Sequence, residues 1–292
     1  PFDKYSDASH RLSTQMKATG EVMSIGRTQE ESLLKAVRSL ETGVCHLWHK
    51  KFDLYTREML LRYIREATDD RIFAIAQLIR LGVDLGLIAS ATKIDMLFLQ
   101  KMKNIVDFEK TVAGAPMDLT VLREAKRMGF SDKYIGKLWG MSEGEMFRLR
   151  QREGIFPVYK MIDTCASEFE SYVPYFYSTY EDENESVVSE RKKIIVLGSG
   201  PIRIGQGVEF DYSTVHAIWA IREAGYETII INNNPETVST DYTTSDKLYF
   251  EPLTVEDVMN VITLEQPEGV VLSLGGQTAN NLAAPLEELG VR

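Results

Sequence analysis

The spacing of apolar residues changes once along this chain, and the change separates two kinds of structure. Between residues 56 and 170, apolar side chains recur every three or four positions, as in TREMLLRYIREATD and LTVLREAKRMG. That period is typical of helices with one buried face. Glycine, proline and capping residues separate these stretches, and no strand-like alternation interrupts them. The pattern predicts a domain of short, closely connected helices.

One more helix is predicted near the start of the chain. In SIGRTQEESLLKAVRSLETG, Thr28 is suited to cap the helix, Glu31 completes a capping box, and Gly43 ends it. Leucine and valine residues at helical spacing give this helix one apolar face.

From Lys193 onward, the pattern changes to alternating strands and helices. KIIVLG, YETIIINNN and GVVLSLGG are apolar runs that predict buried strands, and an amphipathic stretch follows each of them. Such strands joined by crossover helices are typical of a parallel sheet. Three strands are predicted, and a fourth is expected to begin where the sequence stops. The predicted fold is therefore an all-α domain followed by a Rossmann-like α/β domain.

Four regions are predicted from these changes in pattern. They are a set of short pieces (1–50), the helical domain (51–170), a linker (171–192) and the α/β domain (193–292). The linker begins with tyrosines, which we expect to pack on a neighbouring element, and it ends in a solvated, acidic stretch. The chain starts without a methionine, and its last residues, LEELGVR, look like a helix end followed by a new strand. We therefore expect a section of a longer polypeptide.

The overall composition argues against several classes of protein. The 292 residues carry a formal net charge of −10, which disfavours nucleic acid or an anionic membrane as the main partner. Cys45 and Cys165 are too few for a disulfide framework, so the chain is expected to be cytoplasmic. No apolar run reaches the ~18 residues that a membrane helix needs.

The segment VLGSGPIRIGQGVEFDY follows the first predicted strand and is rich in glycine, as nucleotide-binding loops are. The dinucleotide fingerprint requires glycine where Arg203 stands and an acid after the next strand, where asparagines 232–234 stand. A phosphate-binding loop requires a lysine and a hydroxyl residue where Gln206 and Gly207 stand. Neither template is satisfied, so a nicotinamide-dependent enzyme is disfavoured. The loop either presents N–H groups and Arg203 to an anion or forms a tight turn.

Polar segments also follow the other two predicted strands, as NNNPETVSTDY and SLGGQT. The carboxyl ends of parallel strands form the edge at which open α/β sheets bind ligands. Gln277 could donate and accept hydrogen bonds at this edge. Ordinary turn formation, with Thr278 capping a helix, is an equally good interpretation.

Two motifs in the helical region suggest other functions. FSDKYIGKLWGMSEGEMFRLRQREGI resembles a helix-turn-helix with arginines at positions 148, 150 and 152, and this gives a DNA-binding regulator as the alternative function. The alternate positions of the arginines and the acidic chain favour a packed helical hairpin instead. Cys45, His46 and His49 could ligate zinc, but no fourth ligand is evident, so we predict no metal site.

Longer segments resemble the large subunit of carbamoyl phosphate synthetase. GSGPIRIGQGVEFDY, INNNPETVSTDYTTSDKLYFEPLT and GGQT are similar to the start of its second synthetase half, the pre-ATP-grasp domain. ATKIDMLFLQKMKNIVDFE, AKRMGFSDKYIGKLWG and PVYKMIDTCASEFES are similar to its oligomerisation domain. TQMKATGEVMSIGRTQEESLLKAVRSLE is similar to the end of its first ATP-grasp half. The resemblance covers nearly the whole chain, with a small departure at the alanine of ATKID.

The resemblance implies a ligase of arginine or pyrimidine biosynthesis. This family makes carbamoyl phosphate from bicarbonate, two ATP and ammonia that a glutaminase subunit or domain releases from glutamine. Its ATP-grasp halves use Mg2+ or Mn2+ to clamp phosphates, and an internal tunnel carries ammonia and carbamate. The family's pre-ATP-grasp domain does not clasp adenine, so we expect neither ATP nor metal on this chain and no activity from it alone.

The resemblance also implies partners and a location. The helical domain is expected to self-associate, and neither nucleic acid nor a membrane is an expected partner. The location is the cytoplasm, or the mitochondrial matrix for a urea-cycle enzyme.

The resemblance further suggests which residues lie near the substrates. Those expected to line the tunnel and the second site are Gly198, Ser199, Gly200, Arg203, Gly205, Gln206 and Gln277. Glu21 and Arg27, in GEVMSIGR, are expected at the edge of the first site. No catalytic residue and no metal ligand is expected within this chain.

Overall fold

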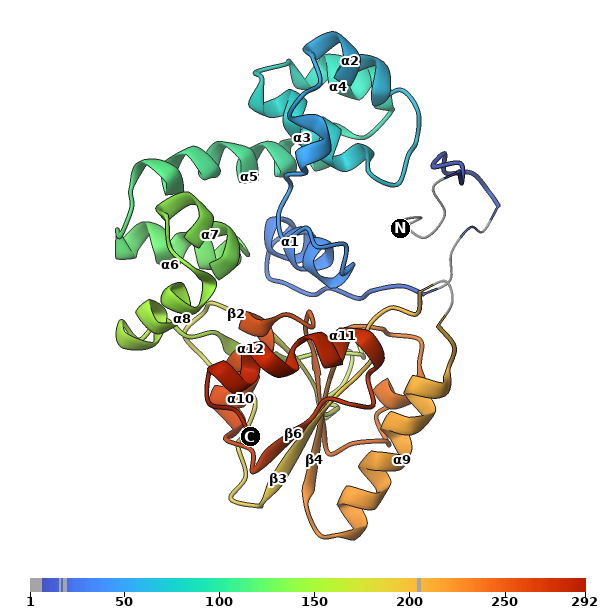
Figure 1. The fold of residues 1–292 in the computed structure, drawn as a ribbon, viewed down its shortest axis with the longest axis vertical. Helices are drawn as coiled ribbons and strands as arrows, with labels where there is room; N and C mark the ends of the chain where they lie inside the picture. The colour runs from blue at the N-terminus through green and yellow to red at the C-terminus, as the bar shows by residue number, and fades with distance from the viewer. Residues whose placement is uncertain (1–6, 16, 18–19, 204–205) are drawn as a thin grey trace.

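The computed structural model describes residues 7–15, 17, 20–203 and 206–292. Figure 1 shows a helical part stacked on an α/β part, with the first helix lying between the two. Within the described residues, no helix has the length and apolar character needed to cross a membrane.

Eight α-helices and one 3-10 helix make up the helical part among the described residues. They are α1 (Gln29–Ser39), η1 (Lys50–Phe52), α2 (Arg57–Tyr63), α3 (Arg71–Arg80), α4 (Leu85–Thr92), α5 (Met96–Gly114), α6 (Leu119–Arg127), α7 (Asp132–Trp139) and α8 (Glu143–Arg152). The predicted cap of α1 is confirmed, because Thr28 Oγ1 accepts a hydrogen bond from the Glu31 N–H at 3.2 Å. The predicted capping box is wrong, because the Glu31 carboxylate accepts from the N–H of Arg27 at 2.7 Å.

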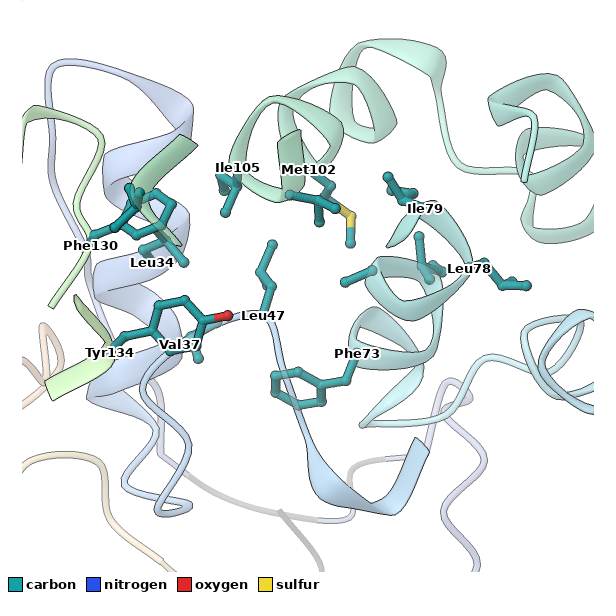
Figure 2. Packing of buried hydrophobic residues seen from close by; sticks show 14 of the residues in the cluster. Leu34, Val37, Leu47, Phe73, Leu78, Ile79, Met102, Ile105, Phe130 and Tyr134 are labelled. Atoms are coloured by element: carbon teal, nitrogen blue, oxygen red, sulfur yellow. The ribbon is translucent and has the colours of Figure 1, made fainter. Parts of the chain in front are cut away.

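One apolar core joins these helices, as Figure 2 shows. Leu34 and Val37 of α1 point into the same cluster as Phe73 of α3, Met102 of α5 and Tyr134 of α7. The helix expected among the short pieces of region 1–50 therefore packs within the helical core. The four predicted domain limits themselves remain predictions.

A six-stranded sheet forms the second part. Its strands are β1 (Val158–Met161), β2 (Tyr175–Thr179), β3 (Lys193–Leu197), β4 (Glu227–Asn232), β5 (Lys247–Phe250) and β6 (Gly269–Val271). Their order is β1-β2-β5-β4-β3-β6, and every neighbouring pair is parallel except β1 with β2. Its helices are α9 (Glu209–Glu223), η2 (Val238–Thr240), α10 (Val255–Glu265), α11 (Gly276–Asn281) and α12 (Ala283–Glu288).

Helices cover the sheet on both faces, with α9 on one side and α10 to α12 on the other (Figure 1). Alternate residues of each central strand serve the two faces. Ile195 and Ile229 lie in the cluster with Val258 of α10, whereas Val196 and Ile230 lie in the cluster with Ile218 of α9. The predicted parallel α/β architecture is confirmed.

The strand predictions were incomplete in three places. Residues 158–161 were expected within the helical region and residues 175–179 within the linker, but they form β1 and β2. β5 was not predicted at all. Their sequences, VYKM, YFYST and KLYF, lack the aliphatic runs from which β3, β4 and β6 were predicted. β2 joins the sheet by pairing with β5, so Tyr175 and Tyr177 of the expected linker become part of the sheet, whereas Tyr172 and Tyr180 lie outside the strand.

Candidate functional site

The glycine loop (Gly198–Arg203) follows β3 at the carboxyl edge of the sheet. The Gly198 N–H donates to the Ile231 carbonyl at 2.9 Å, and the Gly200 N–H donates to Asn232 Oδ1 at 3.0 Å. Asn232 thus stands where a dinucleotide-binding protein has its ribose-binding acid, and it binds the loop instead of a nucleotide. Ser199 is buried in the same turn.

The loop after β6 lies directly against the glycine loop. A Cβ built on Gly275 would lie 2.3 Å from the Gly198 carbonyl oxygen and 2.7 Å from that of Leu197. Only a glycine permits this approach without a shift of the backbone. The approach brings Gln277 and Thr278 to the same edge as Arg203.

Arg203 is bound to the end of α1 rather than free to meet an anion. Its Nη2 donates to the Leu40 carbonyl at 3.2 Å and to the Glu41 carbonyl, and it forms an ion pair with Glu41 Oε2 at 3.2 Å. Thr278 Oγ1 donates to the same carboxylate oxygen. Glu41 is not evident from the sequence, because LETG at the end of a helix is typical of an ordinary turn.

A pocket of about 370 Å³ opens between the helical part and this edge of the sheet. It brings together three of the residues expected at the site, Arg203, Gln206 and Gln277, beside Glu41 and Glu143. The remaining lining residues are Arg38, Gly43, Val44, Cys45, Ser131, Lys133, Leu253, Thr254, Val255, Glu256, Thr278, Asn281 and Leu282. The lining of the pocket does not include Gly198, Ser199 or Gly200. Gly205 lies outside the described residues.

Two acidic residues of this pocket have raised pKa values. Burial raises the pKa of Glu41 to about 7, against the opposing effects of Thr278 and Arg203. Burial also raises the pKa of Glu143 to about 7, and the nearby charge of Glu256 adds to the effect. Near neutral pH, each carboxyl group can therefore exchange a proton with a solute or with water.

Glu21 and Arg27 lie on the segment that precedes α1, away from the lining of this pocket. A hydrogen bond to Glu236, followed by the charge of that residue, raises the pKa of Glu21. The Met23 N–H donates to the Asn233 carbonyl at 2.8 Å, which ties this segment to the end of β4. Arg27 Nε lies 3.0 Å from Glu181 Oε1. The sequence analysis had no reason to pair Glu21 with Glu236, which are far apart along the chain.

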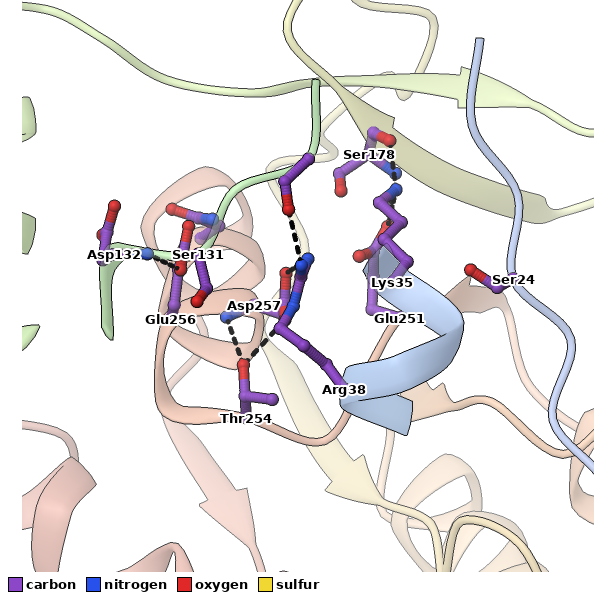
Figure 3. A network of polar contacts seen from close by, with 12 residues as sticks. Ser24, Lys35, Arg38, Ser131, Asp132, Ser178, Glu251, Thr254, Glu256 and Asp257 are labelled. Carbon is purple, nitrogen blue, oxygen red and sulfur yellow. Dashed lines mark hydrogen bonds and ion pairs between the residues drawn. The ribbon is translucent and has the colours of Figure 1, made fainter. Parts of the chain in front are cut away.

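Buried charges hold the two parts together and build the inner wall of the pocket (Figure 3). Arg38 of α1 donates from Nη1 to the Gly129 carbonyl at 2.7 Å and forms an ion pair with Asp257 of α10 at 3.3 Å. The Asp132 N–H donates to Glu256 at 2.6 Å. Glu256 and Asp257 lie in the first turn of α10, where the helix dipole favours negative charge.

The hairpin of α7 and α8 buries one of the arginines on which the DNA-binding hypothesis rests. Arg150, one of the three arginines of the helix-turn-helix hypothesis, is fully buried against Asp132 and therefore cannot reach a phosphate. The packed helical hairpin is the interpretation that the geometry supports.

The candidate zinc ligands are packing residues. His46 is buried, stacks on Tyr134 with ring centroids 3.7 Å apart, and lies with Nε2 3.0 Å from Glu109 Oε1. The ring of His49 packs near Phe73. Among the described residues, no group of three or more His, Cys, Asp or Glu side chains could hold a metal ion.

Two family models match the chain. The model for the carbamoyl-phosphate synthetase large chain oligomerisation domain matches residues 21–154, which contain α1 to α8. The model for the carbamoyl phosphate synthase preATP-grasp domain matches residues 190–292, which contain β3 to α12. The two matches do not overlap, and both describe parts of one large chain. The chain thus belongs to the carbamoyl phosphate synthetase large-chain family.

Proposed function

We propose that this chain is a non-catalytic central section of the glutamine-dependent enzyme. We also propose that the residues lining its pocket form part of the wall of the tunnel through which intermediates reach the second site. The observation that carries the proposal is the pocket itself. It brings Arg203, Gln206 and Gln277 to one cavity between the helical part and the carboxyl edge of the sheet. That edge is the usual ligand side of an open parallel sheet.

The chemistry of the pocket suits small polar solutes. Amide and hydroxyl groups offer donors, and Glu41 and Glu143 offer acceptors that also carry protons near neutral pH. Ammonia and carbamate both carry N–H groups, and carbamate also carries a carboxylate, so either could exchange hydrogen bonds with such a wall.

We propose that the described residues bind neither ATP nor Mg2+. The Gly200 N–H, which a phosphate would need, already donates to Asn232, and the guanidinium of Arg203 is bound at the end of α1. Within the described ranges, no cluster of acidic or other ligating side chains could hold the metal. We propose that both phosphorylation steps, with their ATP and Mg2+ or Mn2+, occur on other parts of the enzyme.

The helical part is proposed as the self-associating part of the chain. The description of its family model supports this role. Leu87, Leu97 and Phe98, at α4 and the start of α5, expose about half of their surface and would be covered by such a contact. The glutaminase partner, the cytoplasmic or mitochondrial location and the arginine or pyrimidine pathway are further parts of the proposal.

The experiment that tests the proposal is a thermal melt with and without millimolar Mg-ATP, combined with a measurement of mass in solution. We expect no shift with Mg-ATP, a dimer or larger assembly, and no ATP hydrolysis or carbamoyl phosphate synthesis by this chain. A ligand present at about 100 times its Kd would stabilise the fold by about 2.7 kcal/mol, so binding would be visible. A clear shift, or turnover near that of an intact enzyme, would contradict the non-catalytic role.

A further inference from the structure

Glu41 has a backbone conformation that non-glycine residues rarely adopt. Its φ is +56°, in the left-handed region, directly after Leu40 closes the last turn of α1. Glycine is the usual residue at such a position, because a side chain there has a steric cost. A non-glycine residue at this position suggests that its side chain has a role worth that cost.

The side chain of Glu41 connects three segments. Its Oε2 forms an ion pair with Arg203 of the glycine loop at 3.2 Å and accepts a hydrogen bond from Thr278 of α11, while its backbone belongs to the end of α1. The backbone carbonyls of Leu40 and Glu41 accept from the same guanidinium. One turn of chain in the helical part thus binds both loops at the carboxyl edge of the sheet.

The glycine loop is shaped around this carboxylate. A Cβ built on Gly200 would lie 2.5 Å from Glu41 Oε1, and Gly200 itself has a φ of +66°. The second glycine of GSG, which suggested a nucleotide loop, is therefore favoured here by its own backbone conformation, and a side chain in its place would displace the carboxylate of Glu41.

We infer that Glu41 is a positioning residue, which holds Arg203 and Thr278 in place and thereby fixes the glycine loop against the helical part. The importance of Glu41 for the enzyme rests on the proposed function, because in that case the glycine loop that Glu41 fixes would be part of the tunnel wall. The contact can nevertheless be tested on this chain alone, without ATP or turnover.

The test is hydrogen–deuterium exchange of the peptide covering residues 197–203, under conditions in which exchange reports the opening equilibrium. Glu41→Leu removes the acceptor and should speed exchange of this peptide by roughly tenfold. Glu41→Gln keeps an acceptor oxygen and should give a smaller effect. Glu143→Leu is the matched control, because Glu143 lines the same pocket from α8 and the described residues give it no hydrogen bond to the loop.

A second variant separates positioning from a simple turn. If residue 41 only ended the helix, Glu41→Gly would relieve the backbone, raise the melting temperature and leave exchange of the loop unchanged. We expect the loop to exchange faster in Glu41→Gly, whatever happens to the melting temperature. Unchanged exchange in both Glu41→Leu and Glu41→Gly would overturn the inference.

A double-mutant comparison keeps the test decisive if Glu41→Leu does not fold. The effects of Glu41→Gln and Arg203→Gln on loop exchange should be far from additive, because each removes the same ion pair. Fully additive effects would overturn the inference. A shift of melting temperature with Mg-ATP would contradict the proposed function and leave this inference intact, so the two can fail separately.

Discussion

Arg150 donates from Nε to both carboxylate oxygens of Asp132 at 2.8 Å and from Nη2 to Oδ2 at 2.6 Å, and both side chains are almost wholly buried. The pair closes the hairpin of α7 and α8. Lys126 joins it from α6 at 3.1 Å from Asp132, and Glu256 joins it from α10 at 3.7 Å from Arg150. Two cations and two anions therefore balance inside the contact between the helical part and the sheet domain.

Replacing Arg150 with Met should destabilise the protein strongly. Asp132 would keep its ion pair with Lys126 but lose its bidentate partner. Removing one partner of a buried ion pair typically lowers the free energy of unfolding by about 3–5 kcal/mol. Urea unfolding would measure the loss. Arg148→Met on the exposed face of the same helix is the control and should change the free energy of unfolding by less than about 0.5 kcal/mol. Equal effects of the two variants would show that the buried pair contributes little.

The outcome for the arginines shows what sequence patterns can and cannot predict here. Periodicity predicted a helical domain and a parallel sheet, and both are present, because most of their elements bury one or both faces in a regular way. It did not distinguish Arg150 from Arg148, because the burial of Arg150 depends on Asp132 and Glu256, which come from other elements. A charged residue at a buried position is invisible to a pattern that counts only apolar side chains.

The candidate site also has features that the sequence predicts and features that it does not. Polar residues at strand ends could be predicted to meet at one edge, because parallel strands end together. The contact of Arg203 with Glu41 could not, since it joins a loop of the sheet to a helix end about 160 residues earlier in the chain. The short strands β1, β2 and β5 needed their neighbours in space before their identity was evident.

His46 should make the fold sensitive to acid. Burial is the largest effect on its pKa and lowers it to about 4 from 6.5, so the folded state resists the proton that the unfolded chain accepts. The stability contributed by neutral His46 is therefore complete above about pH 6.5 and is lost as the pH falls through about 4, by up to about 3 kcal/mol. In His46→Gln, the free energy of unfolding should fall less steeply with acidification.

The control for this prediction is His216, which is exposed on α9. His216→Gln should keep the pH dependence of the unchanged protein. The charged partners of His46 remain in the variant, with Glu109 bound by Arg80 at 2.8 Å. Part of the acid sensitivity at the lowest pH will therefore persist. Burial raises the pKa of Glu109, but the hydrogen bonds and charges of Arg80 and His46 together outweigh burial and lower it, and Arg80 remains in the variant. Parallel curves for His46→Gln and the unchanged protein would refute the assignment.

Glu41 should make the free energy of unfolding depend on pH in the opposite direction to His46. Its pKa is raised to about 7 from 4.5, so the folded state binds a proton more tightly than the unfolded chain does. The stability due to this proton is complete below about pH 4.5 and is lost as the pH rises through about 7. The free energy of unfolding of Glu41→Gln, minus that of the unchanged protein, should rise across this window by about 2–3 kcal/mol.

Other charged groups face the same pocket and set the control for this measurement. Arg203 lies closest to Glu41, and the walls also carry Arg38, Lys133, Glu143 and Glu256. Glu143→Gln should give a similar rise with pH, because its pKa is raised to the same extent. A contrary result would be that the difference in free energy of unfolding between Glu41→Gln and the unchanged protein does not vary with pH, while that for Glu143→Gln does. In that case, the ion pair with Arg203 affects the pKa of Glu41 more strongly than burial does.

Gly275 should tolerate no side chain, although its φ of −82° is open to any residue. A Cβ there would collide with the carbonyl oxygens of Gly198 and Leu197, and backbone cannot swing aside as a flexible side chain can. Gly275→Ala should therefore separate the loops after β3 and β6, at a cost of about 1–3 kcal/mol in urea unfolding. Gly269→Ala in β6 is the matched control, since its Cβ would meet nothing closer than 3.7 Å. That change should be neutral or stabilising, because alanine restricts the unfolded chain. If both alanines had the same effect, the contact between the two loops would not be as close as the structure has it.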